Sequence, residues 1–462
     1  MGKVLKACGC LPFRAGCAYL AALSTMLPVT SLAQATGGCA PESRCLSVNE
    51  NGTIVPGPGP SVAQCTGMFP DFITPTSVLP SGYSGPWFVL SQKYPQSVPP
   101  DDAPWLKIDF MNGTVGANAY LNALRDYAFE GMLDSDFRAQ DNKIRPWFHM
   151  PLMNFGANRR EPSHGLTEER PVNGPELGVR PGVTIRNFAI GFYNAAGGVT
   201  IGEVWKSGTP DLQKARFLDG AMSFKILFSA AAANDFSDPG ADPMSGAPQW
   251  DILTEKGVTA VRLLQMDVAA VDSRSPTGWV FGTFAFQKSA TDASPWLRLR
   301  SVGLSWGNDN GYTPADQQAG KRLSETIISD QAPNYAANHL GWAGRTNGPV
   351  DNPISGCLSC HGTAEFPVAA DLAPFKKSCD TDQNRMYWFR NFRGDVPFGA
   401  VDGQCNPMDV NPPPIALDFS LQMKVTVQSV LQFKDINPCS THQAILKFTI
   451  PAAFQDAPRV QR

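Results

Sequence analysis

The stretch Met222-Ser223-Phe224-Lys225-Ile226-Leu227-Phe228 carries the clearest strand pattern among the 462 residues of the chain. Its Met, Ile and two Phe residues stand at every second position and are separated by Ser, Lys and Leu. Successive side chains of a strand point to opposite faces of a sheet, so this alternation predicts a strand with one buried face. Five nearby segments have a similar strand-like composition: 183–193, 199–205, 258–271, 279–287 and 297–306.

Six strands in succession are too many to be an addition to another fold. They predict a β-rich domain over 103–310, built as a sandwich or as a jelly-roll-like pair of layers. The segment 272–278 contains Asp, Ser, Pro and Gly, and we expect it to form a hairpin loop between two strands. The aromatic residues on these strands are expected to form core rather than to line a ligand cleft.

Helix and turn patterns surround these strands. Apolar residues on one face predict a helix over 116–133. The turn formers at 307–311 mark a domain boundary, and Thr313, followed by Pro and then Asp, has the pattern of a capped helix start. The segment 418–433 fits a final helix but also alternates like a strand. The expected fold class is α+β, with the β-rich domain followed by a smaller, mainly helical domain over 311–462.

The most specific chemical feature lies in this second domain, in Cys357-Leu358-Ser359-Cys360-His361. Cys-x-x-Cys-His is the attachment signature of c-type haem, in which two thiols bond to one porphyrin and the adjacent imidazole binds the iron. A redox disulfide or half of a zinc site would be the alternatives. Zinc would need two more Cys or His at short spacing, and the next Cys is Cys379. A redox motif would start a helix after a strand, whereas Gly-Pro and Asn-Pro turns precede this one.

Through this motif, the last third of the chain resembles the bacterial periplasmic monohaem c-type cytochromes. The resemblance implies one covalently attached haem c, held by Cys357 and Cys360, with His361 as the proximal ligand of the iron. It also implies single-electron transfer between redox partner proteins in the periplasm. One alternative is a peroxidase-like haem oxidoreductase with a substrate cleft in the β-rich domain, although the dihaem peroxidases carry the motif twice and this chain carries it once. A haem-based sensor or binding protein is another.

The ligand on the other side of the iron decides between a carrier and an enzyme. A Met sulfur closes that position, whereas an open position admits small ligands. Met408 fits the loop that precedes the last helix in the cytochromes, and Met386 lies in an aromatic segment suited to haem packing. Met408 is the first choice and Met386 the second. Further candidates are Met423, His339 and His442.

The remaining expectations for histidines concern orientation and packing. A backbone carbonyl should accept the free ring N–H of His361 and fix its orientation. By the same resemblance, Pro367 or Pro374 would supply that carbonyl. His149 and His164 stand fifteen residues apart with no acidic partner in register, so a packing or surface role is favoured over a metal site.

The N-terminal sequence predicts export. Residues 1–33 combine a basic start, an apolar run and a small-x-small cleavage site, which is the pattern of a Sec-type signal peptide. An uncleaved membrane anchor is the alternative, but Ser, Thr and Pro interrupt the apolar run. We expect a periplasmic mature chain without a membrane span, beginning with a Pro/Gly-rich, disulfide-tethered segment over 34–102. The formal charge of −3 argues against nucleic acid as a partner.

The other cysteines are expected to form disulfides in an oxidising compartment. Three lie near the mature N-terminus and three near the C-terminus: Cys39, Cys45, Cys65, Cys379, Cys405 and Cys439. Three is an odd number, so if all six pair, at least one bridge must link the two groups. Non-reducing peptide mapping of the mature protein should recover such a linked pair of peptides. Bridges confined to each group, with one free thiol in each, would contradict the prediction.

Overall fold

The computed structural model describes residues 91–436, except 92, 99, 101–102, 152, 154–159, 162, 175, 207–209 and 255–256. It also describes two short strands nearer the N-terminus, β1 (Ser47–Val48) and β2 (Ile54–Val55). The predicted signal peptide and most of the predicted Pro/Gly-rich segment lie outside the described residues. So do four of the six cysteines expected in disulfides: Cys39, Cys45, Cys65 and Cys439.

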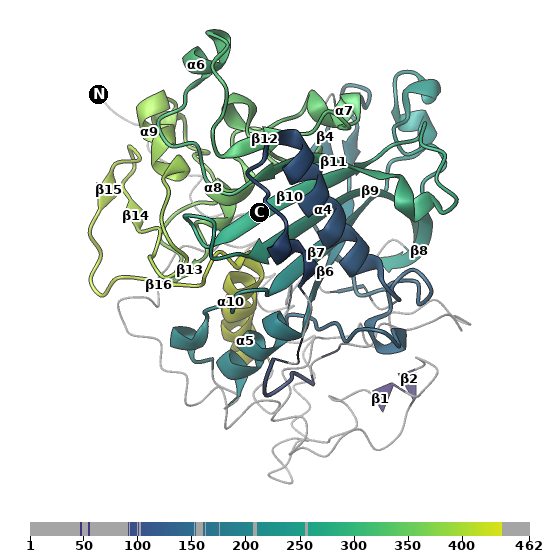
Figure 1. The fold of residues 1–462 in the computed structure, drawn as a ribbon, viewed down its shortest axis with the longest axis horizontal. Coiled ribbons are helices and arrows are strands. Elements are labelled where there is room, and N and C mark those ends of the chain that lie inside the picture. The colour runs from purple at the N-terminus through teal and green to yellow at the C-terminus, as the bar shows by residue number, and fades with distance from the viewer. Residues whose placement is uncertain are drawn as a thin grey trace, which may run out of the picture.

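An eight-stranded antiparallel sheet organises the described chain (Figure 1). Its strands follow the order β12-β11-β10-β9-β7-β6-β3, and β8 pairs with the first part of β9. Their bounds are β3 (Thr167–Glu168), β6 (Asn187–Tyr193), β7 (Met222–Ser229), β8 (Gln249–Thr254), β9 (Gly257–Val271), β10 (Trp279–Phe286), β11 (Leu299–Ser305) and β12 (Thr326–Ile328). A mixed fold with a large β-rich part is therefore confirmed.

The described strands do not form the predicted sandwich or jelly roll, because outside this sheet they make only two-stranded pairs. Besides β1 with β2, these pairs are β4 (Val172–Asn173) with β5 (Thr184–Ile185), β13 (Glu365–Phe366) with β16 (Ile415–Ala416), and β14 (Ala400–Val401) with β15 (Pro407–Met408). Helices, rather than a second large sheet, supply the covering layers. Their bounds are α4 (Gly113–Phe129), α5 (Ala195–Trp205), α6 (Pro314–Gln318), α7 (Asn334–Ala337), α8 (Cys357–His361), α9 (Asp382–Met386) and α10 (Leu421–Ile436).

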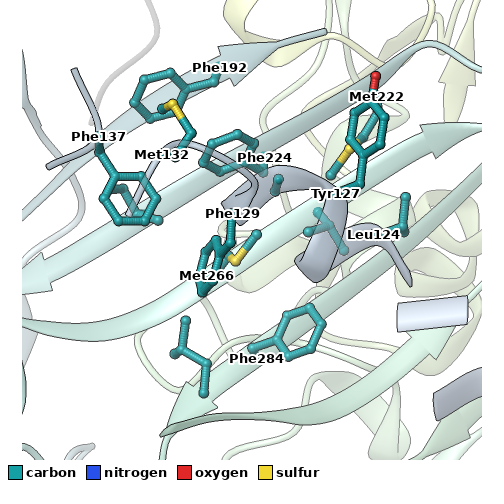
Figure 2. Close-up of a cluster of buried hydrophobic side chains, with 14 of the residues drawn as sticks. Leu124, Tyr127, Phe129, Met132, Phe137, Phe192, Met222, Phe224, Met266 and Phe284 are labelled. Carbon is teal, nitrogen blue, oxygen red and sulfur yellow. The ribbon is translucent and has the colours of Figure 1, made fainter. Parts of the chain in front are cut away.

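The first face of the sheet is covered by α4, which crosses the sheet in Figure 1. The period-two apolar set of β7 points to this side, and Figure 2 shows Met222 and Phe224 beside Leu124 and Tyr127 of α4. Phe284 of β10 joins the same cluster. The prediction that strand aromatics form core is confirmed here.

The second face is covered by α5, α8 and α10, and the residues of this layer come from distant parts of the chain. Phe281 of β10 shares a buried cluster with Leu358 of α8 and with Met423 of α10. The sheet also continues past residue 310, since β12 pairs with β11. The boundary at 310/311 stays a prediction, but the parts on its two sides share a strand pairing and a hydrophobic core.

The structure contains a helix at each of the three places where the sequence predicted one. The helix predicted at 116–133 is α4, three residues earlier at its start. Thr313 caps α6, and its side chain accepts the N–H of Asp316 in a capping box. Most of the ambiguous segment 418–433 belongs to helix α10, which begins at Leu421 and packs on the sheet instead of pairing with it.

The strand predicted at 199–205 is wrong, because this segment belongs to helix α5. Asn194 caps the helix with its side-chain oxygen, which accepts the N–H of Gly197. Ile201, Val204 and Trp205 then fall at helical spacing and are buried against the second face. The apolar residues of this segment fit both the period of a helix, 3.6 residues, and that of a strand, two residues. The Asn194 cap favours the helix.

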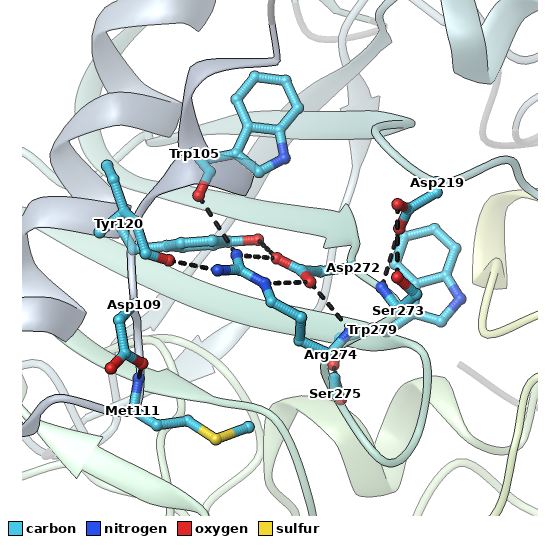
Figure 3. Close-up of polar contacts among 11 residues, drawn as sticks. Trp105, Asp109, Met111, Tyr120, Asp219, Asp272, Ser273, Arg274, Ser275 and Trp279 are labelled. Atoms are coloured by element: carbon cyan, nitrogen blue, oxygen red, sulfur yellow. Dashed lines mark hydrogen bonds and ion pairs between the residues drawn. The ribbon is translucent and has the colours of Figure 1, made fainter.

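A polar network ties the predicted hairpin loop at 272–278 to the helical layer on the first face (Figure 3). Arg274 donates to both carboxylate oxygens of Asp272 and to the backbone carbonyl of Ile108. The hydroxyl of Tyr120 in α4 donates to the same carboxylate at 3.0 Å. The loop thus fixes the end of the β9–β10 hairpin, whose strands carry part of the candidate site.

Asn194 is expected to be a strong determinant of stability. It is buried, its side-chain oxygen also accepts the N–H of Met222 at 2.9 Å, and its amide donates to the carbonyl of Gly220 at 3.0 Å. Asn194→Ala should lower the free energy of unfolding by about 2–4 kcal/mol, because it removes the cap and leaves buried backbone groups unpaired. Urea denaturation measures this, with Asn334→Ala at an exposed position as the control. Equal stability of the two variants would contradict the assignment.

Candidate functional site

The Cys-x-x-Cys-His motif forms the short helix α8, from Cys357 to His361. Positions i, i+3 and i+4 of a helix lie on one face, so the two thiols and the imidazole are neighbours on its surface. Leu358 and Ser359, which lie between them in sequence, are buried. Cys357, Cys360 and His361 all keep accessible surface. The helix therefore presents its two cysteines and its histidine together on one accessible face.

The ring of His361 is held in a defined orientation. Its Nδ1 lies 2.8 Å from the backbone oxygen of Phe419, which can only accept, so Nδ1 carries the hydrogen and Nε2 has the lone pair. The Phe281 ring lies 4.6 Å from the imidazole, centre to centre. Burial lowers the pKa of His361 to about 4, which keeps the ring neutral at pH 7. A neutral imidazole with a free Nε2 is the form that binds a metal.

The carbonyl that orients His361 belongs to Phe419, not to the expected Pro367 or Pro374. Phe419 and the preceding Asp418 both have left-handed backbone conformations, with φ of 58° and 48°, which are costly for residues other than Gly. The Asp418 carboxylate accepts the indole N–H of Trp279 at 2.8 Å and the backbone N–H of Phe217 at 2.6 Å. These bonds hold the turn that aims the Phe419 carbonyl at the histidine.

The two thiols of α8 are not joined in a disulfide. Burial raises the pKa of Cys357 well above its usual value and that of Cys360 to about 12, so both are protonated thiols at neutral pH. A redox-active or metal-binding cysteine needs a thiolate and usually has a lowered pKa. The environment of this motif is therefore unlike that of a nucleophilic Cys-x-x-Cys. Within the described residues, no group of three or more His, Cys, Asp or Glu is arranged to hold a metal ion.

The accessible face of α8 lies close to polar residues on the second face of the sheet. Lys225 on β7 and Asp267 on β9 are cross-strand partners, and their charged groups lie 3.2 Å apart. Both keep about a quarter of their side-chain surface accessible, at 27% and 25%. Desolvation is nevertheless the largest influence on the pKa of each, so both are enclosed by protein.

Lys225, Asp267, Cys357, Cys360 and His361 all keep part of their surface accessible, and we call the region around these five residues the recess. Its charged groups influence the motif: Asp267 raises and Lys225 lowers the pKa of Cys357, and Lys225 also lowers the pKa of His361. A separate pocket lined in part by Cys357 has no space even for one water molecule, so it is far smaller than the roughly 300–1,000 Å³ of small-molecule sites.

The polar residues of the recess are fixed by further contacts. The Thr283 hydroxyl of β10 donates to Asp267 at 2.7 Å. The Gln265 amide on β9 donates to Asp267 at 2.7 Å and to Asp351 at 3.1 Å. Burial raises the pKa of Asp267, whereas at Lys225 burial is outweighed by neighbouring carboxylates, with Asp267 first, and the pKa rises. The Lys225 side chain is thus an ammonium ion inside the protein.

The methionines predicted as candidate distal ligands have different surroundings. Met408, on the small hairpin of β14 and β15, is 48% exposed. The sulfur of Met386 accepts the backbone N–H of Gly311, and its side chain packs in a different cluster from Cys357. Met423 shares the cluster of Cys357 and is buried. The choice of distal ligand stays a prediction.

One disulfide is present among the described cysteines, between Cys379 and Cys405. It lies within the C-terminal group, so the expected bridge between the two groups would have to use Cys439, outside the described residues. The two other predicted histidines have packing roles. His149 is buried against Phe192, and the His164 ring stacks on Trp250 at 4.3 Å.

Comparison with protein-family models, with curated proteins and with solved structures finds no match to this chain. Within the described residues, no helix has both the length and the apolar character needed to cross a bilayer.

Several residues around the motif were not singled out from the sequence. Asp267 could have been singled out from the sequence, because it is the one acidic residue in the otherwise largely apolar run 263–271. Lys225 had no such signal, because a Lys that alternates with apolar residues in a strand with one buried face is expected to face solvent. Asp418 and Phe419 had none, because a left-handed turn at non-glycine residues leaves no local pattern.

Removing the Asp418 side chain should destabilise the protein. Asp418→Ala leaves the Trp279 indole and the Phe217 N–H without an acceptor inside the protein, which costs about 2–4 kcal/mol in the free energy of unfolding. Asp409→Ala, at an exposed position, should change it by less than about 0.5 kcal/mol. Chemical denaturation of both variants provides the measurement. An Asp418→Ala variant as stable as the control would show that the turn is held by other contacts.

Proposed function

We propose that this chain is a c-type cytochrome that binds one haem c covalently through Cys357 and Cys360. His361 is the proximal axial ligand in this proposal. The observation that carries it is the shared accessible face of α8, where two thiols stand beside an imidazole with a free Nε2. This donor set fits the attachment of a haem, and the recess gives the accessible face of α8 enclosed surroundings.

The haem, when bound, supplies an iron centre that takes up and releases one electron. The protein residues have positioning roles. Cys357 and Cys360 fix the attachment, and the Phe419 carbonyl fixes the histidine tautomer so that Nε2 faces the metal. Phe281 packs beside the imidazole and excludes water on that side.

In this proposal the protein is exported by its predicted signal peptide to the periplasm and passes single electrons between redox partner proteins there. The haem-bearing part is the predicted domain 311–462, a smaller, mainly helical, cytochrome c-like unit. Its long helix is α10, and α6 to α9 have four or five residues each. Its difference from a separate cytochrome is that it packs on the sheet through a common core.

A second candidate is a haem oxidoreductase or sensor that binds small ligands at an open iron position. The positions of the two preferred methionines favour it, because Met408 is half-exposed and the Met386 sulfur already accepts a hydrogen bond. Absorption spectra of the loaded protein with and without cyanide separate the candidates. A low-spin spectrum that cyanide does not change supports the carrier. A high-spin spectrum that cyanide changes supports the ligand-binding candidate.

Covalent attachment is the first test of the proposal. Expression with export and cytochrome c maturation should give a mature chain whose intact mass includes one haem, retained after acid-acetone extraction. The double variant Cys357→Ala/Cys360→Ala should lose the haem mass. Cys379→Ala/Cys405→Ala is the matched control, since it removes two cysteines that pair with each other, and it should keep the haem. Free extraction of haem from the wild type would contradict the proposal.

A further inference from the structure

Two opposite charges lie inside the protein beside the attachment cysteines. The ammonium group of Lys225 lies 3.2 Å from Asp267, at the wall of the recess. The Asp351 carboxylate lies in the loop before α8 and accepts the Gln265 amide at 3.1 Å. These groups lie beside the motif, because Thr283, which donates to Asp267 at 2.7 Å, stands two residues along β10 from Phe281, whose ring lies 4.6 Å from that of His361. Lys424 is a further interior charge near the motif, since its ammonium group donates to the Thr363 carbonyl at 2.9 Å.

The position of Asp351 is fixed by the loop and by the sheet together. Its carboxylate accepts the backbone N–H of Gly348 at 3.0 Å as well as the Gln265 amide. A Cβ at Gly348 would lie 2.1 Å from the Gln265 side-chain nitrogen, so a larger residue there would displace the Gln265 amide. Farther along this loop, the backbone N–H of Cys357 donates to Thr346. The carboxylate is therefore held at a fixed place relative to the helix that carries the motif.

Lys225 is equally constrained, by the register of the sheet. It pairs across the strands with Asp267, which pairs in turn with Thr283 on β10. A polar row at this depth costs free energy unless every charge has a partner. The row leaves the second face polar at the place where α8 packs, although an apolar row would stabilise the sheet at least as well. Such a row is explained if its charges act on a group held by α8.

We propose that Lys225 and Asp351, held in place by Asp267 and Gln265, set the reduction potential of the haem bound at α8. This inference rests on the proposed function. An oxidised haem carries one more positive charge than a reduced one. A fixed carboxylate therefore favours the oxidised form, and a fixed ammonium favours the reduced form. In the interior these effects are stronger than in water and are only weakly screened by salt.

The two charges predict shifts of opposite sign. Asp351→Asn keeps the shape of the side chain and removes a negative charge, so it should raise the potential. A tenfold change in the equilibrium constant with a fixed one-electron partner, about 59 mV, is the expected size. Lys225→Met should lower the potential, by a smaller amount, because the Asp267 carboxyl left behind takes up a proton more readily when buried. Lys225→Arg keeps the charge and should stay near the wild type.

Redox titration of the haem-loaded variants, followed by absorption, is the test. Asp409→Asn and Lys321→Met, which change exposed charges, are the matched controls and should stay close to the wild type. The shift of Asp351→Asn should persist in 0.5 M salt, roughly three times the ionic strength of the cell. Thermal unfolding of the same samples checks that each variant is folded. Asp351→Asn is the milder change and carries the test if Lys225→Met does not fold.

The outcomes are distinct. Opposite shifts for Asp351→Asn and Lys225→Met, with unchanged controls, support the inference. A haem-loaded wild type whose Asp351→Asn variant keeps the same potential, or shifts downwards, overturns the inference and leaves the proposed function standing. A wild type that carries no covalent haem overturns both.

Discussion

The central strands of the sheet are buried on both faces, and this constraint shapes the rest of the structure. Every residue of β10 is buried, and most of β9 is as well. A sheet of this kind needs a cover on each side. Helix α4 supplies one cover, and α5, α8 and α10 supply the other. The Cys-x-x-Cys-His helix is thus part of the layer that completes the core, which explains why its Leu358 and Ser359 are buried while its cysteines and histidine face the recess.

Charged side chains also lie beneath the helices that cover the second face. Around Lys225 and Asp267 the sheet offers a polar row in place of apolar side chains, and α8 faces that row. A purely structural layer would be expected to be apolar throughout. The left-handed turn at Asp418 and Phe419 is a second costly feature, and it aims a carbonyl at His361. Both features lie around one imidazole, which fits a functional site better than a simple packing interface.

The sequence predicted local features well and spatial ones poorly. The alternation at 222–228 identified β7, and Thr313 identified the start of α6, because each depends on residues close together in the chain. The segment 199–205 was assigned to a strand because its apolar residues fit two periods, and only the Asn194 cap decides between them. The single large sheet replaced a sandwich because no strand pattern shows that helices will cover both faces. In the site, the motif was evident, but Phe419 reaches His361 across 58 residues, a pairing that only the folded chain reveals.

A crystal structure of the mature, haem-loaded protein would test the central claim most directly. The account predicts a porphyrin in the recess beside Lys225 and Asp267, with thioether bonds to Cys357 and Cys360. His361 should bind the iron through Nε2 while its Nδ1 still donates to the Phe419 carbonyl. A porphyrin bound elsewhere on the chain, or a His361 that is not an iron ligand, would contradict the account.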